Sequence, residues 1–233
     1  MPLSMVAENI KRLQERVAEV AIKAGRDPAR VSIMAVTKTQ PARLVNEAIA
    51  GGITLLGENR AQEFREKYDE YDRRGDVEIH FIGHLQTNKV KMVLGKVSAI
   101  QSVDSFKLAK EISGQGAKLG VTTDLLLEIN IGQEENKSGI APDEAEDLIR
   151  QIAVLPNVKL RGLMAIPPVW RGSEDNERFF AQMEEKFVDI REKKIDNISM
   201  EILSMGMSDD FAPAIKHGST LVRLGSAIFG QRH

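Results

Sequence analysis

The chain contains no cysteine and few aromatic residues. None of its 233 residues is a cysteine, and phenylalanine, tryptophan and tyrosine together make up only 5%. Disulfide bonds, thiolate nucleophiles and zinc sites built on thiolates are therefore excluded. Hydrophobic residues make up 42% of the chain, which at this length is enough for a sizeable buried core.

The chain also lacks an excess of charge and any long hydrophobic run. Its 32 basic and 34 acidic residues give a net charge of −2, so it has no basic surplus for a phosphate backbone and we expect no nucleic-acid partner. No apolar stretch is long enough to cross a bilayer, and the first residues lack the apolar segment of a signal peptide. We therefore expect no membrane association and a cytoplasmic location.

Short apolar runs alternate with longer amphipathic segments along the chain. Eight such runs are separated by helical patterns, as parallel strands joined by crossover helices require. Some of these runs, such as TDLLLEIN, are nearly continuous in apolar residues, which indicates strands buried on both faces. The pattern predicts an α/β fold, a single (β/α)8 TIM-type barrel domain over residues 1–233 with an extra N-terminal helix. A doubly wound open sheet is the alternative that periodicity leaves open.

The expected elements follow from this pattern. Strands are expected at residues 33–37, 53–56, 78–82, 98–101, 123–130, 158–163, 199–203 and 220–224. Helices are expected at residues 4–24, 42–50, 60–73, 86–94, 105–117, 142–154, 174–191 and 209–217, with another opening after residue 225.

The loops that follow the strands of such a barrel form its functional face. Here they carry four cations, Lys38, Lys89, Lys137 and Arg223. The last two loops contain glycine–serine turns that lead into helical patterns, at 206–210 and 225–230. Glycine permits close backbone approach and helix N-termini present N–H groups, so we interpret Ser208, Gly225 and Ser226 as a phosphate site. Taken singly, each serine is better explained as a helix cap and each glycine as an ordinary turn, and the phosphate interpretation rests on all of them together with Arg223 nearby.

Lys38 follows the first apolar run directly. A lone lysine at a strand end commonly extends into solvent. If Lys38 instead points into a barrel mouth that binds phosphate, burial and nearby cations favour a neutral, nucleophilic amine. A lysine that forms a Schiff base opposite a phosphate site suggests pyridoxal 5′-phosphate (PLP), an aldehyde that carries a phosphate.

Seven motifs in a fixed order extend over essentially the whole chain. They are AVTKTQP (35–41), GENR with Gln62 and Glu63 (57–63), HFIGHLQTNK (80–89), NKSG (136–139), RGLMAIPP (161–168), SMGMSDDF (204–211) and GSTLVRLGSAIFG (218–230). Together they resemble the motifs of the PLP homeostasis proteins, also called the YggS or PROSC family. These proteins are single-domain relatives of the alanine racemase barrel.

The resemblance implies where PLP is bound. It implies an aldimine on Lys38 and a phosphate site formed by Ser208, Gly225 and Ser226. Arg223 would face either the phosphate or the edge of the ring that carries the pyridine nitrogen, and we favour the ring edge. A guanidinium keeps its proton, so that nitrogen would stay unprotonated and the cofactor would be a poor electron sink. The implied cofactor-binding residues are Lys38, Asn59, Met207, Ser208, Arg223, Gly225 and Ser226, with His84 as a further lining residue.

Two functions compete for such a site. One is a carrier or buffer that binds PLP reversibly, and the other is a PLP-dependent amino-acid racemase. A two-base racemase needs a second base on the far face of the cofactor, which alanine racemases supply as a tyrosine from another domain. The tyrosines here, Tyr68 and Tyr71, lie in the charged segment EKYDEYDRR, away from the expected rim. We therefore expect a monomeric carrier without catalytic residues, with PLP-dependent apo-enzymes as further partners.

Other polar residues near the rim have two interpretations each. His80 and His84 have HxxxH spacing but lack the adjacent glutamate and the helix of a zinc site, so we predict no metal and place His80 in the core. Lys137 is either a relay amine for incoming aldehyde or a solvated loop lysine.

The sequence also contains a glutamate at the end of the second expected strand and a glycine-rich segment that resembles a nucleotide-binding motif. Glu58 is either a base near the cofactor or a structural carboxylate paired with Arg60 or Lys38. The glycines at 114–116 imitate a nucleotide-binding fingerprint, but they precede an expected strand, so we interpret them as the end of a helix.

Overall fold

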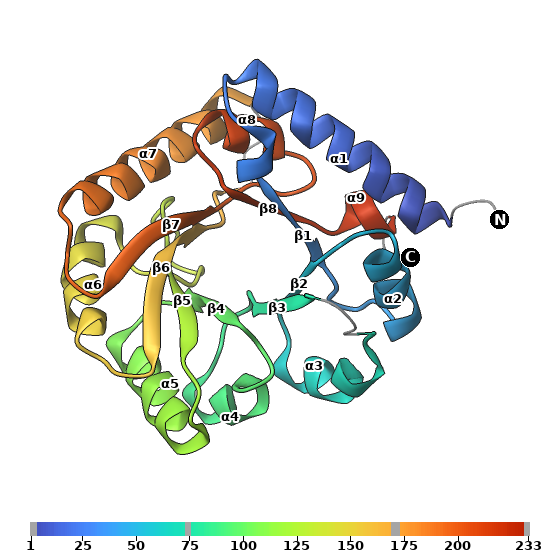
Figure 1. The fold of residues 1–233 in the computed structure, drawn as a ribbon. Coiled ribbons are helices and arrows are strands. Elements are labelled where there is room, and N and C mark those ends of the chain that lie inside the picture. The colour runs from blue at the N-terminus through green and yellow to red at the C-terminus, as the bar shows by residue number, and fades with distance from the viewer. Residues whose placement is uncertain (1–3, 73–75, 169–172, 231–233) are drawn as a thin grey trace.

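A computed structural model describes residues 4–72, 76–168 and 173–230, which form a barrel of strands surrounded by helices (Figure 1). The strands are β1 (Ser32–Val36), β2 (Leu55–Glu58), β3 (Glu78–Phe81), β4 (Ala99–Val103), β5 (Thr123–Ile129), β6 (Val158–Ala165), β7 (Ile198–Ser204) and β8 (Leu221–Leu224). The α-helices are α1 (Met5–Lys23), α2 (Ala42–Ala50), α3 (Ala61–Lys67), α4 (Val90–Val93), α5 (Phe106–Leu119), α6 (Ala145–Ala153), α7 (Ser173–Glu192), α8 (Phe211–Lys216) and α9 (Ser226–Phe229). Short 3-10 turns are η1 (Pro28–Arg30), η2 (Tyr68–Glu70), η3 (Thr87–Lys89) and η4 (Pro142–Glu144).

The sheet closes on itself. Each strand pairs in parallel with the next one along the chain, and β8 pairs with β1, where Ile33 lies opposite Val222 and Ala35 opposite Leu224. This closure confirms the predicted (β/α)8 barrel and excludes the doubly wound open sheet, which would leave two unpaired edges.

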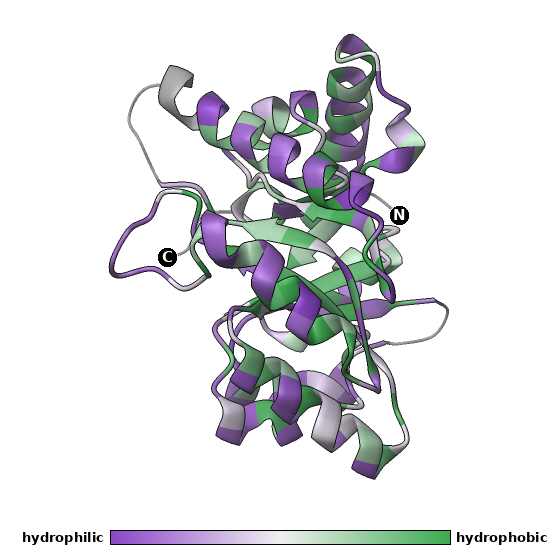
Figure 2. Ribbon diagram, turned by 90° about the vertical axis from the view of Figure 1, so that its left-hand side faces the viewer, coloured by the Kyte–Doolittle hydropathy of each residue, from purple (hydrophilic) through white to green (hydrophobic). Residues whose placement is uncertain are grey.

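The apolar runs form the inner core, as their composition predicts. In β5, Leu125, Leu126 and Leu127 are all fully buried, because one face of the strand packs inside the barrel and the other against helices. The helices are hydrophobic toward the strands and hydrophilic outward (Figure 2). Burial on both faces holds the strand ends in fixed positions, and the loops that follow them start from a rigid frame.

The extra N-terminal helix, α1, packs across the outside of the barrel. The Ser4 hydroxyl accepts a hydrogen bond from the Ala7 N–H and caps the helix. Its buried positions recur at helical spacing and are Val6, Ile10, Leu13, Val17 and Ala21. The Asn9 amide donates to the Ile228 carbonyl at 2.9 Å, so α1 lies beside α9 and the end of the described chain (Figure 1).

Several predicted bounds differ from the structure. The helices expected at 60–73, 86–94 and 209–217 are shorter, and the first two are partly 3-10 turns. The Asp210 carboxylate accepts the Met207 N–H at 2.6 Å, which makes a turn of residues 207–210 and delays the start of α8. Gly120 ends α5 with a φ of 67°, so the glycines at 114–116 do belong to the end of a helix. Within the described ranges, no helix is long and apolar enough to span a membrane.

Candidate functional site

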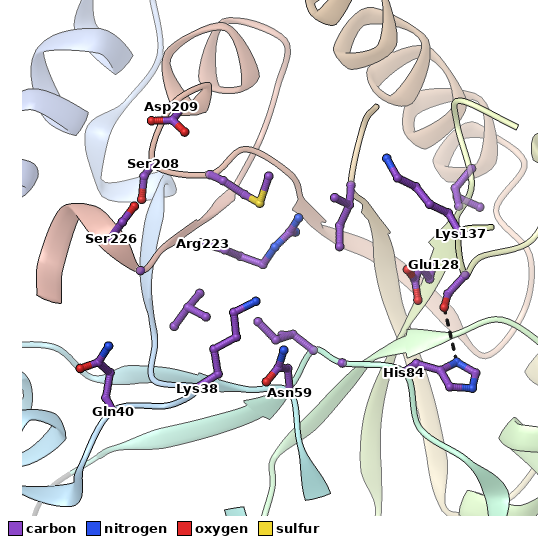
Figure 3. A pocket seen from close by; sticks show the side chains of 18 of the residues that line it. Lys38, Gln40, Asn59, His84, Glu128, Lys137, Ser208, Asp209, Arg223 and Ser226 are labelled. Atoms are coloured by element: carbon purple, nitrogen blue, oxygen red, sulfur yellow. Dashed lines mark hydrogen bonds between the residues drawn. The ribbon is translucent and has the colours of Figure 1, made fainter. Parts of the chain in front are cut away.

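A cavity of about 530 Å³ opens at the C-terminal ends of the strands (Figure 3). Every residue that the sequence analysis assigned to cofactor binding lines it: Lys38, Asn59, Met207, Ser208, Arg223, Gly225 and Ser226. His84 and Lys137 line it as well, from the loops after β3 and β5. Lys89, the fourth expected rim cation, is exposed and does not line this cavity. The volume and the mixed lining are those of a site for a small molecule.

The turn that carries Lys38 is held from below by Lys67 of α3. The Lys67 ammonium donates to the carbonyls of Thr37, at 3.2 Å, and Gln40, at 3.0 Å, one before Lys38 and one after it. Between them, Thr39 has a φ of 63°, a conformation that a β-branched residue rarely adopts. Its N–H donates to the Glu63 carboxylate at 2.6 Å. The turn therefore has a fixed shape, and the Lys38 side chain extends from it into the cavity (Figure 3).

Glu58 belongs to the same support and not to the cavity. It is fully buried at the end of β2, and its Oε1 accepts hydrogen bonds at 2.6 Å from the Thr37 hydroxyl and from the Tyr71 hydroxyl. Its cationic neighbour is Lys67, at 3.6 Å. Of the two interpretations, Glu58 is thus a structural carboxylate, and the cation beside it is Lys67, because α3 brings this lysine under the strand end.

Tyr71 is likewise enclosed. Burial, together with the neighbouring Glu58 carboxylate, raises the pKa of Tyr71 above its usual value, so the phenol keeps its proton as a hydrogen-bond donor. It does not line the cavity. The sequence placed it in a charged segment away from the rim, and its burial against Glu58 was not foreseen.

The two serines of the expected phosphate site lie beside each other at one end of the cavity (Figure 3). The Ser208 hydroxyl accepts the Ala227 N–H at 3.3 Å, which ties the loop after β7 to the start of α9. Neither serine caps the helix that follows it in the chain. The interpretation as N-caps of the helices that follow them is therefore wrong for both, although Ser208 does satisfy an N–H in the first turn of α9. Gly206 has a φ of 92°, and a Cβ there would lie 2.6 Å from that of Ala214, so the turn needs glycine.

Arg223 reaches the cavity from β8 and is almost completely buried. Its Nη1 donates to the Ser204 carbonyl at 2.8 Å and to the Ser204 hydroxyl at 2.7 Å, and its Nη2 donates to the Ala165 carbonyl at 2.9 Å. Burial lowers the pKa of Arg223 to about 10, although the Glu128 and Asp210 carboxylates act in the other direction. The guanidinium stays charged at neutral pH, and two of its five N–H groups have no acceptor in the described ranges.

Glu128 is a charged residue of the cavity that was not predicted from the sequence. It lies near the end of β5, is 6% exposed, and accepts no side-chain hydrogen bond from any described residue. Burial and the nearby Asp104 carboxylate raise the pKa of Glu128 to about 7, against the attraction of Arg223. The signal was present, because Glu128 is the one charged residue after a run of three leucines.

His80 and His84, which have HxxxH spacing in the sequence, lie in different surroundings. His80 is buried and bonded to Gln101, as a core residue would be, while the exposed His84 lies 3.8 Å from Asp104 and 3.5 Å from the Ser138 hydroxyl. No group of three or more possible metal ligands occurs among the described residues.

The comparisons with known proteins agree with this architecture. The chain matches the family model described as alanine racemase, N-terminal domain, over residues 3–233. It is 40% identical to the pyridoxal phosphate homeostasis protein of Aquifex aeolicus, over 97% of each chain. It is also 40% identical to that of Pseudomonas aeruginosa, over 99% of this chain and 97% of the relative.

A solved structure is similar over the same length. The protein PipY of Synechococcus elongatus, in a structure with PLP bound, is 30% identical, and the match covers 97% of this chain and 100% of that one with a TM-score of 0.84. Sequence and fold therefore agree over nearly the full length, and the chain belongs to the family of pyridoxal phosphate homeostasis proteins, whose barrel is related to the N-terminal domain of alanine racemase.

Proposed function

We propose that residues 1–233 act as one PLP-binding domain that holds the cofactor as a Schiff base on Lys38 and serves as a carrier or buffer in intracellular PLP homeostasis, without robust turnover. One observation carries the proposal: Lys38 and the serines of the last two loops, far apart in sequence, open into the same cavity. The amine suits the aldehyde of PLP, and the hydroxyl and backbone donors suit its phosphate.

The other lining residues fit the same ligand. Ser208, Gly225 and Ser226 would hold the phosphate, while Asn59 and Met207 would flank the ring. A Cβ at Gly225 would lie 3.5 Å from Val36, so this glycine is not required by crowding within the chain. It instead leaves its backbone open to a ligand.

Arg223 favours a carrier over an enzyme. When bound, PLP supplies an electron sink, which is strongest when its ring nitrogen is protonated. Arg223 keeps its own proton at neutral pH and offers only N–H donors, so it would hold that nitrogen in the unprotonated form. A buried arginine here therefore suits binding better than carbanion chemistry.

The alternative is a PLP-dependent enzyme of the racemase type. Such an enzyme needs a second base across the cofactor from the lysine. Tyr71 does not serve, because its hydroxyl donates to Glu58 beneath the cavity. A monomeric state, delivery of PLP to apo-enzymes and a cytoplasmic site of action remain predictions from the sequence.

The experiment that tests the proposal is a titration of the purified protein with PLP. We expect a visible band near about 420 nm, which borohydride abolishes by reducing the imine, and a reduced adduct that mass spectrometry locates on Lys38. Lys38→Ala should lose both, and Lys89→Ala, which removes an exposed lysine outside the cavity, should keep both. A band of equal strength in Lys38→Ala would refute the assignment.

A second measurement separates the carrier from the enzyme. The loaded protein is incubated with L-alanine, and chiral chromatography follows the appearance of D-alanine. A carrier gives no conversion above that of free PLP, while sustained turnover that Lys38→Ala abolishes would support the racemase alternative.

A further inference from the structure

A network of polar side chains, buried except for Glu78 at its far end, crosses the interior of the barrel. It begins at Arg223, whose Nη1 lies 2.7 Å from the Ser204 hydroxyl, and that hydroxyl lies 2.7 Å from Oε1 of Gln101. The Gln101 amide nitrogen lies 2.8 Å from Nδ1 of His80, and His80 Nε2 lies 3.5 Å from the Glu78 carboxylate. The network thus connects the cavity at the C-terminal ends of β7 and β8 with the start of β3 at the opposite end.

Arg223 and the Gln101 amide oxygen fix the directions of these hydrogen bonds. A guanidinium only donates and an amide oxygen only accepts, so the Ser204 hydroxyl accepts from Arg223 and gives its own proton to Gln101 Oε1. The Gln101 amide nitrogen then faces His80 and donates, which requires an unprotonated Nδ1. His80 is therefore neutral, with its proton on Nε2 toward Glu78.

The members of the network are not ordinary core filling. Ser204 and Gln101 are completely buried and His80 is 4% exposed, in a barrel interior that aliphatic side chains usually fill. Burying polar groups of this kind costs free energy unless each has a hydrogen-bond partner. In this network they all have partners only if every hydrogen bond points from Arg223 toward His80. Ser102, next to Gln101 on β4, shows the contrast, because its buried hydroxyl has no hydrogen-bond partner in the part of the chain that the structure describes.

We propose that Gln101 and His80 are positioning residues for Arg223 and, through Ser204, set the orientation of its guanidinium toward the cavity; the proposal rests on the proposed function in that Arg223 contacts PLP. If Gln101 no longer accepts, nothing in this network fixes the Ser204 proton and the hydroxyl is free to rotate. The lone pair that Nη1 uses then has no fixed direction, so one of the three acceptors that orient the guanidinium is weakened.

Gln101→Met is the decisive variant, because Gln101 does not bond to Arg223 and the change reaches it only through Ser204. Hydrogen bonds to charged groups are strong, and we expect PLP to bind about tenfold more weakly to Gln101→Met. Borohydride trapping should still label Lys38. Ser102→Ala is the matched control, because it removes a buried hydroxyl that lies on the same strand but does not belong to the hydrogen-bond network. This variant should bind PLP like the wild type.

Nitrogen-15 NMR of the histidines tests the network without any cofactor. In the wild type and in Ser102→Ala, His80 should be the neutral tautomer protonated at Nε2. In Gln101→Met this preference should be lost. A wild-type His80 protonated at Nδ1 would overturn the direction of the network, even if Gln101→Met failed to fold.

The binding data separate the two proposals. If the wild type does not bind PLP, the proposed function is wrong and the positioning role falls with it. If the wild type binds PLP and Gln101→Met binds it as tightly as Ser102→Ala does, the positioning role alone is wrong.

Discussion

Replacing Glu128 by glutamine should make the protein more stable, and only at high pH. Glu128 is 6% exposed and its carboxylate receives no side-chain hydrogen bond from the described residues, so ionising it is costly. Its pKa rises from 4.5 to about 7, through burial first and the Asp104 carboxylate second. A rise of this size corresponds to about 3 kcal/mol of difference between the two protonation states.

Whether stability rises or falls with pH depends on whether the folded or the unfolded chain binds the Glu128 proton more tightly. The folded chain holds the proton of Glu128 up to a pH of about 7, while the unfolded chain releases it near 4.5. The stabilisation from this proton is therefore fully present below a pH of 4.5 and is lost as the pH rises through about 7. Glutamine resembles the protonated acid and does not ionise, so Glu128→Gln escapes this loss.

The assay is urea unfolding of the protein without PLP at about pH 4 and about pH 8.5. We expect Glu128→Gln to match the wild type at the lower pH and to exceed it by about 3 kcal/mol at the higher one. Glu135→Gln, at an exposed site in the following loop, removes the same charge and should differ little from the wild type at either pH. An equal gain at both pH values would refute the reasoning, because no titration would then be involved.

Three further changes test the support of the site and the barrel. Lys67→Met should lower the free energy of unfolding in urea by about 3 kcal/mol, because the buried Glu58 carboxylate loses its cation. It should also weaken PLP binding, because the turn around Lys38 loses two hydrogen bonds. The control Lys91→Met, at an exposed site, should change neither stability nor binding. Gly162→Ala should lower the melting temperature sharply or prevent folding, since a Cβ there would lie 1.8 Å from a carbonyl oxygen of β7. Gly114→Ala, in open space on an exposed turn of α5, should instead stabilise by about 0.5–1 kcal/mol, and a loss there would contradict the helix geometry.

The fold was predictable because its signal is local. Apolar runs such as TDLLLEIN identify buried strands, and the patterns between them identify helices. Closure of the barrel was not local, since it depends on pairing between β1 and β8 at opposite ends of the chain. Periodicity describes each of these strands alone, so it could not distinguish a closed barrel from an open sheet.

The site was predictable only where residues directly follow strands. Lys38 and Ser208 could be placed on one rim because strand ends share an edge in a parallel barrel. Lys67 and Tyr71 could not, because EKYDEYDRR has the charge pattern of a solvated helix. Their burial arises from the way α3 folds back under the end of β2, where they enclose Glu58.

Glu58 and Glu128 are two buried carboxylates of the same barrel with different roles. Both end or nearly end a strand, and the sequence offers no difference between them. Glu58 accepts two hydroxyl protons and has a cation at 3.6 Å, so its Oε1 is satisfied by the chain and its work is structural. Glu128 faces the cavity and receives no side-chain hydrogen bond in the described ranges. Arg223 lies near it and has two N–H groups without an acceptor in the same ranges. Glu58 Oε2 also has no hydrogen-bond partner among the described residues, but it lies outside the cavity. Glu128 and Arg223 line the cavity, so the acceptor and the donors that they leave open there are within reach of a ligand.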